Sequence, residues 1–517
     1  MPAMINADDL ISQIRTKNKN ELCPLIGMLD DPYHQSQHQI SLPISSQGNC
    51  LIYGSAGSGT SMLLKTILYS LIKTHDASEV NCYLLDFGSE TLKDFRDAPQ
   101  VGDVILSSES EKISNLFKML REELKKRKEL FSETGGNYTN YCSLTRKPIA
   151  NILVIINNYS AFKEAYEEAN NELLGLTRDG VNCGIYFILT ASQTNAVWYQ
   201  LSQNFSQRLV LQMNDPNDYS ILLGKTEGLQ PAKISGRGLV QKERILEFQT
   251  ATCPLDQQQL RIYCKQLRVQ SEITARKVPV LPQQVTLNDF DIKPDLQHLP
   301  IGIQCESLAQ VTQNLSKNYI TFITGTDVQS SYSVLKGVIN ACQNIENVEV
   351  QILDGDCVVS EGGNSAGYIK QIQDLFYEVR DRNNRYKEAG DVRVLDQERE
   401  KIIILTGYSR IVGLLDSDGQ ENLDLILEKG ETYYKMHFIL MDSLTAFASV
   451  TSRVWYKRHV NGNGLWIGNN FGDQYMLKVS KTLQSYYDEI GEQFGYWVYK
   501  GKAVRIKLIE KEDDDHE

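Results

Sequence analysis

The segment GSAGSGTS at residues 54–61 contains the residues best suited to bind a phosphate. It follows the apolar run CLIY and precedes the amphipathic run MLLKTILYSLI, so we expect it to connect a strand to a helix. In that setting glycines let backbone N–H groups converge on an anion, and the helix N-terminus adds its dipole. The segment therefore predicts a nucleotide-binding loop formed by Gly54, Ser55, Ala56, Gly57, Ser58, Gly59, Thr60 and Ser61.

This loop departs from the phosphate-loop pattern G-x-x-x-x-G-K-[ST] at its charged position, where Thr60 replaces the lysine. That lysine normally binds the β and γ phosphates. Lys65 cannot readily replace it, since five helical residues turn its side chain by roughly 140° and move it about 7.5 Å away. Ser61 still occupies the position whose hydroxyl binds magnesium. Three interpretations stay open: ATP binding without efficient hydrolysis, an empty pocket, and a glycine turn with no ligand.

The strand that should carry the catalytic acids ends in amides. In nucleotide hydrolases with this loop, a buried strand ends in two carboxylates, of which one holds magnesium through water and the other polarises the attacking water. Here the run ILVII leads into Asn157 and Asn158. An amide carries no negative charge and does not act as a base. We therefore name no confident catalytic residue and expect ATP and magnesium, if bound, only at the first loop.

Short apolar runs alternate with longer amphipathic runs along the chain, as in CLIYG, SMLLKTILYSLIK, NCYLLDF, SEKISNLFKMLREELKKRKELF, NILVII and GIYFILTA. Strands that are apolar on both faces and separated by helices form a parallel sheet covered on two sides. The sequence therefore predicts an α/β layered fold.

The same order of elements returns after about 250 to 270 residues, which indicates an internal repeat. Five segments match in order: CPLIG with LPIGI, LIYGSAGSGTS with FITGTDVQSSY, YLLDFG with QILDGD, LVIINNYSAF with IIILTGYSRI, and GIYFILTAS with MHFILMDSL. The chain is therefore expected to contain two diverged copies of one domain.

The second copy departs further from a nucleotide site than the first. Its loop keeps Gly325 but has Ser330, Ser331 and Tyr332 at the last three positions of the pattern. We expect the bulky Tyr332 to obstruct a nucleotide. At the second strand, Thr406 and Gly407 replace both acids.

Residues 268 and 269 mark the expected boundary between the two domains. The stretch that follows mixes charge, Pro and Gln without a sustained helical period. We expect one domain over residues 21–268 and a second over residues 269–510. Residues 1–20 are predicted to be a connecting segment, and residues 511–517, KEDDDHE, a solvated acidic tail.

Composition excludes several function classes. The chain has 517 residues, with 53 Lys+Arg against 65 Asp+Glu and a net charge of -12, which disfavours DNA binding. Its ten cysteines show no CxxC spacing, and we expect them to be reduced in a cytosol. The only close histidines, His34 and His38, lack a third ligand, so no metal site is predicted. No apolar run approaches ~18 residues, so we expect no membrane anchor in this chain.

Several of these motifs resemble the FtsK/SpoIIIE-type ATPases, and within them the C-terminal tandem ATPase domains of type VII secretion ATPases of the EssC/EccC type. The resemblance covers nearly the whole chain. LCPLIGMLDDP is similar to the family's entry to the domain, and YLLDFGSETLKDFRDAPQVGDVI to its second strand and loop. REELKKRKELFSETGGNYTNY (121–141) is similar to an arginine-rich helix that precedes the acidic strand, and VRDRNNRYKEAG (379–390) is its shorter echo.

The resemblance implies two tandem RecA-like P-loop domains in a hexameric motor at the cytoplasmic face of a bacterial membrane, attached through other segments or subunits. It implies WXG-type secreted proteins as cargo, other type VII secretion components as partners, and substrate recognition by the last domain. Our leading hypothesis is a degenerate module that regulates the ring and recognises such substrates. The alternatives are a weakly active motor that translocates DNA or protein, and an adaptor that binds no nucleotide.

Other candidates have a structural and a functional interpretation each. Ser192 and Gln193 follow a core strand, where the family has a sensor of the γ phosphate, and a simple turn is equally expected. Arg208 and Arg237 could act as arginine fingers, although surface arginines of a strand or hairpin are the simpler prediction. The aromatic stretch 452–477 is expected mainly to pack in the core, with a partner surface as the alternative. Residues 493–510 alternate as closing strands.

Overall fold

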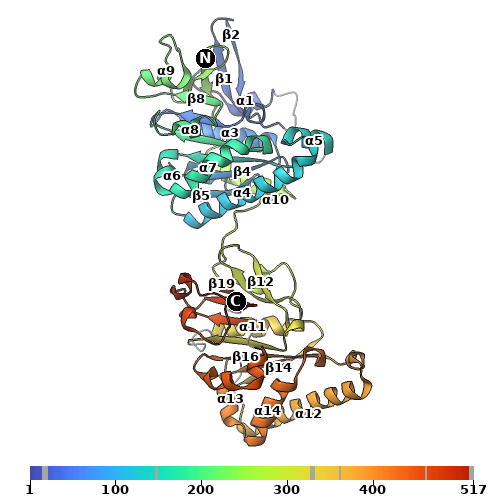
Figure 1. Ribbon diagram of the computed structural model, residues 1–517. Helices are drawn as coiled ribbons and strands as arrows, with labels where there is room; N and C mark the ends of the chain where they lie inside the picture. Colours follow the sequence, from blue (N-terminus) through green and yellow to red (C-terminus); the bar gives the residue numbers. More distant parts are fainter. Residues whose placement is uncertain (14–20, 146–148, 327–331, 360–362, 460–462, 512–517) are drawn as a thin grey trace. The chain divides into compact units, whose positions relative to one another are not determined.

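A computed structural model describes residues 1–13, 21–145, 149–326, 332–359, 363–459 and 463–511 of the chain (Figure 1). The chain divides into two compact units, Met1–Val280 and Leu281–Glu517, which we call unit 1 and unit 2. Each unit is described separately below.

Unit 1 is built on one ten-stranded sheet with the order β2-β1-β10-β9-β8-β3-β7-β6-β4-β5. Strands β8, β3, β7, β6, β4 and β5 pair in parallel, and the remaining strands extend the sheet antiparallel beyond β8. The strands are β1 (Leu25–Asp31), β2 (Ser36–Ser41), β3 (Cys50–Tyr53), β4 (Val80–Asp86), β5 (Val101–Leu106), β6 (Asn151–Asn157), β7 (Ile185–Ala191), β8 (Gln207–Leu211), β9 (Arg237–Gln241) and β10 (Ile245–Thr250).

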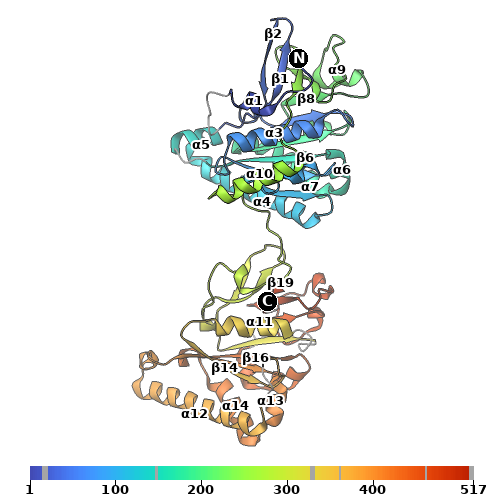
Figure 2. The same cartoon turned by 180° about the vertical axis from the view of Figure 1, so that it is seen from behind.

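Helices cover both faces of this sheet, as the sequence predicts. The helices are α1 (Ala7–Ile11), α2 (Ile44–Gln47), α3 (Thr60–Thr74), α4 (Ser110–Phe131), α5 (Tyr138–Thr145), α6 (Tyr159–Ala165), α7 (Glu167–Asp179), α8 (Tyr199–Ser202), α9 (Asn217–Leu223) and α10 (Gln257–Gln270). Helices α1, α3 and α10 pack on one face, seen in Figure 2, and α4, α6 and α7 on the other. The short strand β3 contributes to both cores, because Cys50 and Ile52 face one layer and Leu51 and Tyr53 the other.

Unit 2 repeats this plan on a nine-stranded sheet with the order β12-β11-β19-β18-β17-β13-β16-β15-β14. Its strands are β11 (Leu299–Gln304), β12 (Gln310–Gln313), β13 (Ile320–Gly325), β14 (Val348–Asp354), β15 (Glu400–Thr406), β16 (Met436–Ser443), β17 (Gly464–Ile467), β18 (Phe494–Tyr499) and β19 (Lys502–Leu508). Helix α11 (Tyr332–Gln343) packs on one face; α12 (Ser365–Ala389), α13 (Tyr408–Leu414), α14 (Ser417–Lys429) and α15 (Val454–His459) pack on the other. The predicted closing strands are β18 and β19, an antiparallel hairpin.

The pairing register supports the repeat residue by residue. In unit 1, Leu51 of β3 lies opposite Leu189 of β7, and in unit 2, Phe322 of β13 lies opposite Leu440 of β16. In unit 1 the central strand β3 is followed by the loop and helix that the sequence predicts, and in unit 2 helix α11 follows β13 along the chain, with residues 327–331 outside the described ranges. The predicted α/β class, with tandem units of the same layered design, is confirmed.

The ends of unit 1 differ from the simple expectation of linkers. Ile5, Ala7 and Leu10, in the stretch expected only to connect, are buried in its core. Residues beyond α10 also pack on unit 1, because the Ala275 N–H donates to Pro99 O and Tyr83 Oη donates to Arg276 O. Residues 14–20 and 512–517, including most of the expected acidic tail, lie outside the described residues. Within the described ranges, none of the helices combines the length and apolar character needed to cross a membrane.

Candidate nucleotide site

The predicted loop of unit 1 borders a cavity of about 510 Å³ at the carboxyl ends of β3, β6 and β7. Ligands of open parallel sheets bind at this edge. Among the described residues that line the cavity, none has an ionisable side chain. The lining residues are Gly54, Ser55, Ala56, Gly57, Gly59, Thr60, Ser61, Gly88, Ser89, Asn157, Asn158, Thr190, Ala191, Ser192 and Ser235.

Contacts with two distant loops hold the phosphate loop open. The Ser55 N–H and its hydroxyl both donate to Gln212 O, and the Gly236 N–H donates to Ser58 O at 2.8 Å. Gly59 has a φ of +100°, and a Cβ there would lie 2.4 Å from the nitrogen of Gly236. Glycine is therefore required at this position by conformation and by space. Helix α3 begins at the next residue, so its first N–H groups point toward the cavity edge without intrahelical acceptors.

No cationic side chain takes the place of the missing lysine among the described residues that line the cavity. The Thr60 hydroxyl lies 3.1 Å from the Ser58 hydroxyl, a contact between two neutral groups. Lys65 points to Asp94, with its Nζ 3.2 Å from Oδ2, and Arg261 binds the other oxygen of that carboxylate. The expectation that Lys65 does not serve the loop agrees with this geometry. Any phosphate here would be held by backbone N–H groups and hydroxyls alone.

Asn157 is bound at both ends of its amide. Its Nδ2 donates to Asp86 Oδ1 at 2.8 Å, and its Oδ1 accepts from the Thr190 hydroxyl at 2.9 Å. The Asn158 N–H in turn donates to Thr190 Oγ1, and the Asn158 side chain donates to Phe87 O. This chain of hydrogen bonds joins the ends of β4, β6 and β7. It fixes the amide that replaces the acid and provides no group that could activate water.

Asp86 lies opposite Asn157 at the end of β4, and it is buried with 2% of its surface exposed. Besides Asn157, it accepts the N–H groups of Gly88 and Leu92. These donors satisfy both oxygens, so the carboxylate braces the strand ends and does not line the cavity. Sequence reasoning assigned no role to Asp86 or Thr190. Both could have been found from the sequence, because each is the polar residue that ends an apolar run, Asp86 in YLLD and Thr190 in FILT.

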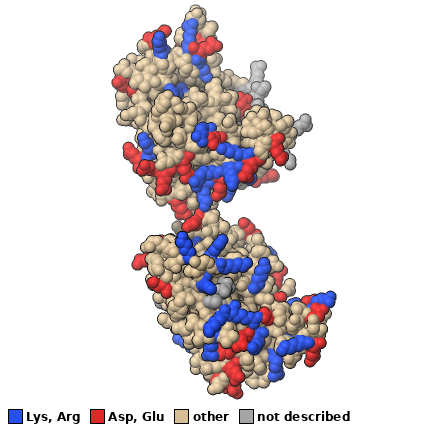
Figure 3. Space-filling model, viewed as in Figure 1, with Lys and Arg blue, Asp and Glu red and all other residues tan. Residues whose placement is uncertain are grey.

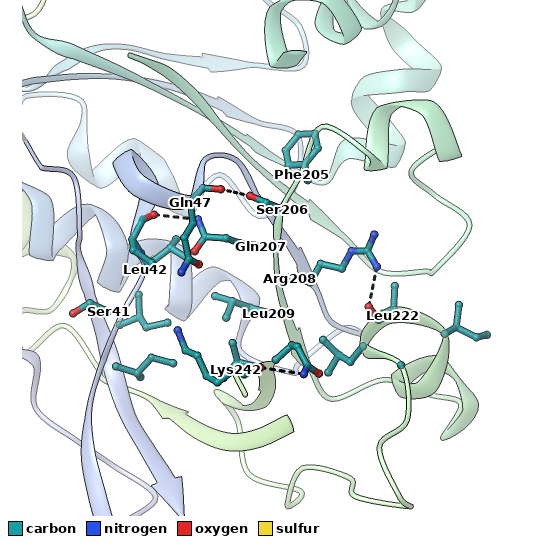
Figure 4. A pocket seen from close by; sticks show the side chains of 18 residues that line it. Ser41, Leu42, Gln47, Phe205, Ser206, Gln207, Arg208, Leu209, Leu222 and Lys242 are labelled. Carbon is teal, nitrogen blue, oxygen red and sulfur yellow. Dashed lines mark hydrogen bonds between the residues drawn. The ribbon is translucent and has the colours of Figure 1, made fainter. Parts of the chain in front are cut away.

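The structure places the sensor and finger candidates apart. Ser192 lines the cavity, whereas Gln193 is exposed and is not among its lining residues. Arg208 of β8 borders a separate cavity of about 420 Å³, where its guanidinium donates to Leu222 O at 3.0 Å (Figure 4). Burial raises the pKa of the Tyr53 hydroxyl, and the charge of Arg208 opposes this shift.

Arg237 of β9 is not a surface arginine, because only 5% of it is exposed. Its guanidinium binds Gln249 Oε1 at 2.7 Å, Glu247 Oε2 at 3.2 Å and the carbonyl oxygens of Met1 and Pro2. These contacts tie β9, β10 and the N-terminal residues together. In this arrangement the side chain serves the structure of unit 1.

The corresponding region of unit 2 is acidic and braced in a different way. The Thr406 hydroxyl donates to Asp354 Oδ1 at 2.6 Å, as Asn157 does to Asp86. Asp442, the last residue but one of β16, takes the register position that Ala191, the last residue of β7, has in unit 1. It accepts the N–H and the hydroxyl of Ser409. A Cβ on Gly407, which has a φ of +59°, would lie 2.5 Å from the Asp356 carboxylate. Asp354 corresponds to Asp86 of unit 1, and Asp356 and Asp442 add two further buried carboxylates at this edge.

Tyr332 stands at the start of α11 and donates its hydroxyl to Asp356 O at 3.0 Å. Burial raises the pKa of Tyr332, and the Asp356 carboxylate adds to this shift. Arg410 lies 3.6 Å from the same carboxylate and donates to Gly355 O, so its charge is used locally. The positions of Ser330 and Ser331 lie outside the described residues. The register places Gly464 opposite Phe322, where unit 1 has Arg208 opposite Leu51, so unit 2 lacks this arginine.

The arginine-rich helices have a structural role in both units. Arg127 of α4 donates to Ala150 O and Cys183 O, just before β6 and β7, and pairs with Glu123. Arg382 of α12 donates in the same way to Arg399 O and Tyr434 O, just before β15 and β16. Both arginines are buried. Each joins a helix to the starts of two core strands.

The aromatic stretch of unit 2 is mainly core, as expected. Trp455, Trp466 and Phe471 are buried, while Tyr475 is 55% exposed. His34 pairs with Asp31 at 2.7 Å. Over the described ranges, no group of three His, Cys, Asp or Glu side chains could hold a metal ion.

Comparison with known proteins supports the family resemblance. Residues 15–228 match the sequence model of the FtsK/SpoIIIE family. The chain is 26% identical over 515 residues to the ESX secretion system protein YukB of Bacillus subtilis, covering 93% of this chain and 33% of that protein. The chain thus spans about a third of the length of the curated relatives it matches.

Solved structures share the tandem arrangement of domains. EssC ATPases 2 and 3 from Geobacillus thermodenitrificans match with a TM-score of 0.81 and 20% identity, covering 99% of both chains. EccC ATPases 2 and 3 from Thermomonospora curvata, solved in complex with a signal sequence peptide, match with a TM-score of 0.54 and 18% identity, covering 97% of this chain and 95% of that one. The fold is therefore that of two consecutive P-loop ATPase domains, as predicted.

Proposed function

We propose that this chain, whose residues 15–228 match the FtsK/SpoIIIE family, is the tandem ATPase-like module of a type VII secretion motor. In this proposal it corresponds to ATPases 2 and 3 and works at the cytoplasmic face of the membrane, attached through other segments or subunits. Unit 1 binds a nucleotide without turning it over. Unit 2 binds none and contributes to the recognition of WXG-type substrates and to regulation of the ring.

The uncharged cavity of unit 1 is the observation that carries the proposal. Its glycine loop, its helix N-terminus and the lining hydroxyls of Thr60, Ser61, Ser192 and Ser235 offer hydrogen bonds to phosphates. The other lining hydroxyls, those of Ser55, Ser89 and Thr190, already donate to Gln212 O, Thr91 Oγ1 and Asn157 Oδ1. Hydrolysis needs more than binding, because charge must be stabilised in the transition state and water must be activated. Neither the lysine nor the two acids are present, and the Asn157 amide is already bound at both ends. The geometry thus supports nucleotide binding by unit 1 and does not support nucleotide hydrolysis there.

Magnesium would meet a reduced set of ligands at this site. The Ser61 hydroxyl lies 3.4 Å from that of Ser89, at the position that binds magnesium in phosphate loops. The acid that would hold a magnesium-bound water is replaced by Asn157. We therefore assign ATP to unit 1 and give magnesium a minor part in its binding.

The role proposed for unit 2 rests on the negative charge at the sheet edge where a phosphate would bind. The buried Asp356 and Asp442, which unit 2 has in addition to the carboxylate shared by Asp354 and Asp86, repel a polyphosphate. A signal sequence peptide was captured by the comparable EccC module. We therefore assign substrate recognition to the module and nucleotide exclusion to unit 2.

Calorimetry with ATP and a steady-state turnover assay on the whole chain test the nucleotide part. We expect one binding site per chain and a turnover below about 0.01 s⁻¹, two orders of magnitude under the ~1 s⁻¹ of slow ordinary enzymes. Gly59→Ala should abolish binding because of its contact with Gly236 and its φ of +100°, whereas Gly175→Ala in α7, where an added Cβ would meet nothing within 4 Å, is the control outside the cavity. Turnover at ordinary rates by the unmodified chain would contradict the proposal.

Affinity purification of the tagged chain from its source cell tests the secretion part. We expect WXG-type proteins and a membrane-bound ATPase partner to be recovered together. An unrelated protein with the same tag provides the control. Recovery of DNA-binding proteins alone, or steep salt-dependent binding of DNA at physiological salt, would favour a DNA motor instead.

A further inference from the structure

A groove of about 740 Å³ lies at the antiparallel end of the unit 2 sheet. It is formed by strand β12, the β18–β19 hairpin and the segments before β11, after β12 and before β17. Its lining residues are Gln297, Gln310, Val311, Thr312, Asn314, Lys317, Asn318, Asn463, Trp497, Tyr499, Lys500, Lys502 and Val504. It lies on a different part of the sheet from the degenerate loop.

The groove is positively charged. Lys317, Lys500 and Lys502 are exposed, and among the described residues that line the groove there is no Asp or Glu. In the part of the chain that the structure describes, these lysines form no ion pair, and Lys500 lies over the Tyr499 ring at 5.2 Å. Lysine and arginine side chains gather over the end of unit 2 that carries β12 and β19 (Figure 3). The groove therefore concentrates unneutralised charge in a protein whose net charge is -12.

Unit 1 provides an internal comparison, because its β1–β2 and β9–β10 hairpins form a groove of about 800 Å³ at the equivalent place. There the charges are balanced within the groove. His34 pairs with Asp31 at 2.7 Å, Arg244 lies over the Tyr33 ring at 4.1 Å, and Glu243 accompanies them. The fold thus does not require lysines without acids at this position. The excess of positive charge is specific to unit 2.

The walls of the groove indicate which anion it suits. Amide side chains line its walls, and the Gln297 amide, the Asn314 Nδ2 and the Asn318 Oδ1 can pair with the N–H and C=O groups of a main chain. Two other amides are bound within unit 2, because Gln310 donates to Asp289 O and accepts the Asp291 N–H, and Asn463 donates to Gln313 Oε1. Trp497 is only 5% exposed and forms the floor, and the exposed Tyr499 ring is already covered by the Lys500 ammonium, so neither ring offers a free platform on which a base could stack. These features favour a peptide over a nucleic acid.

We propose that this groove docks an extended, acidic peptide segment of a partner protein. The carboxylates of the segment pair with Lys317, Lys500 and Lys502, while its main chain binds the amide walls. Because the groove is positively charged, its partner is expected to be acidic. The groove of unit 1, whose charges are balanced, has no such preference. The inference does not depend on nucleotide binding by unit 1.

Binding of fluorescein-labelled hexaglutamate to the whole chain, followed by fluorescence anisotropy at low salt, tests the proposal. The triple variant Lys317→Gln/Lys500→Gln/Lys502→Gln should bind about tenfold more weakly, as expected for the loss of three exposed ionic contacts. The matched control is Lys370→Gln/Lys387→Gln/Lys457→Gln, which removes the same charge from exposed positions of unit 2 outside the groove. It should bind within about twofold of the unmodified chain.

Carbodiimide crosslinking of the same peptide locates the contact, because an activated carboxylate forms an amide with a nearby lysine amine. We expect peptide bonded to Lys317, Lys500 or Lys502 by mass spectrometry. Equal loss of binding in both triple variants, or crosslinks spread over other lysines, would overturn the proposal. Tighter binding of single-stranded DNA than of hexaglutamate, with the same dependence on the groove lysines, would assign the groove to nucleic acid instead.

Discussion

The same sheet edge differs in charge between the two units, because unit 2 adds Asp356 and Asp442 to the strand-end carboxylate that both units have. In unit 1 the edge borders a cavity without ionisable side chains, held open by Gly59 and Gly236. In unit 2 it carries Asp354, Asp356 and Asp442, each buried, and the Tyr332 hydroxyl donates to Asp356 O. Both have lost the charged groups of a hydrolase, but only unit 1 keeps a place where a phosphate would meet N–H groups without meeting carboxylates.

The comparison separates what an ATPase fold needs for chemistry from what it needs for structure. Asn157 and Thr406 replace a catalytic acid, yet each donates to the carboxylate at the end of the next strand, Asp86 or Asp354. A bond between neighbouring strand ends stabilises the sheet whether or not the site is catalytic. The strand-end network therefore coexists with loss of the catalytic groups in both units.

The largest expected effect concerns the shared arginine bridge. Arg127→Ala and Arg382→Ala should each lower the free energy of unfolding of their own unit by about 3–5 kcal/mol, because each leaves buried acceptors without a donor. Calorimetry and hydrogen exchange on the whole chain would show which unit unfolds first. Arg121→Ala, whose side chain is 56% exposed and pairs with Glu172, serves as the control and should cost no more than about 0.5 kcal/mol. If only one of the two arginine variants lowers the free energy of unfolding by about 3–5 kcal/mol, the two bridges are not equivalent.

Restoring the loop charge should sharpen the difference between the units. Thr60→Lys is expected to increase the affinity for ATP by about tenfold or more, since a lysine adds a charge-assisted contact to the phosphates. Turnover should stay low because the acids are still absent. Titration calorimetry should continue to show one site per chain, with the gain confined to unit 1. Appearance of a second site would contradict the acidic character assigned to unit 2.

The fold and the loop could be predicted from the sequence because their signals are local and periodic. Apolar runs gave the strands, and the spacing from Gly54 to Ser61 gave the cavity edge. The roles of Thr190, Asp86 and Arg127 could not be obtained in this way. Each acts through a contact with a residue far along the chain, as in the bond from Arg127 to Cys183 O, 56 residues away. Arg237 was misjudged as exposed because the pattern of β9 does not reveal the N-terminal residues that cover it.

Acid should destabilise unit 2 through His459. Burial lowers the pKa of His459 to about 4, and the charge of Arg458 adds to this shift. Because an unfolded histidine titrates near ~6.5, the unfolded state binds more protons between these values, so stability is present above pH ~6.5 and falls as the pH decreases toward 4. Since the side chain is partly exposed, we expect a loss of about 1 kcal/mol between pH 7 and 5. Chemical unfolding at both pH values measures it, and His459→Gln should remove this part of the dependence.

The smallest expected effect is that of magnesium on the unmodified chain. Asp86 already accepts N–H groups from Gly88, Leu92 and Asn157, so no ionised carboxylate is left to hold a magnesium-bound water. Removing magnesium with a chelator should therefore change the affinity of unit 1 for ATP by less than about threefold. Calorimetry in the presence and absence of the ion provides the measurement.

The variant Asn157→Asp should reverse this insensitivity. Its new carboxylate would lie where the amide nitrogen is now 2.8 Å from Asp86 Oδ1, and two carboxylates at that distance cannot both stay ionised without a cation or a proton between them. We therefore expect magnesium to stabilise this variant and to strengthen its ATP binding, while the equivalent Thr406→Asp change in unit 2 gives no ATP site. If magnesium changes the ATP affinity of Asn157→Asp no more than that of the unmodified chain, the expectation is wrong. The hydrogen bonds around Asp86, and not the missing acid, would then determine how strongly magnesium affects binding.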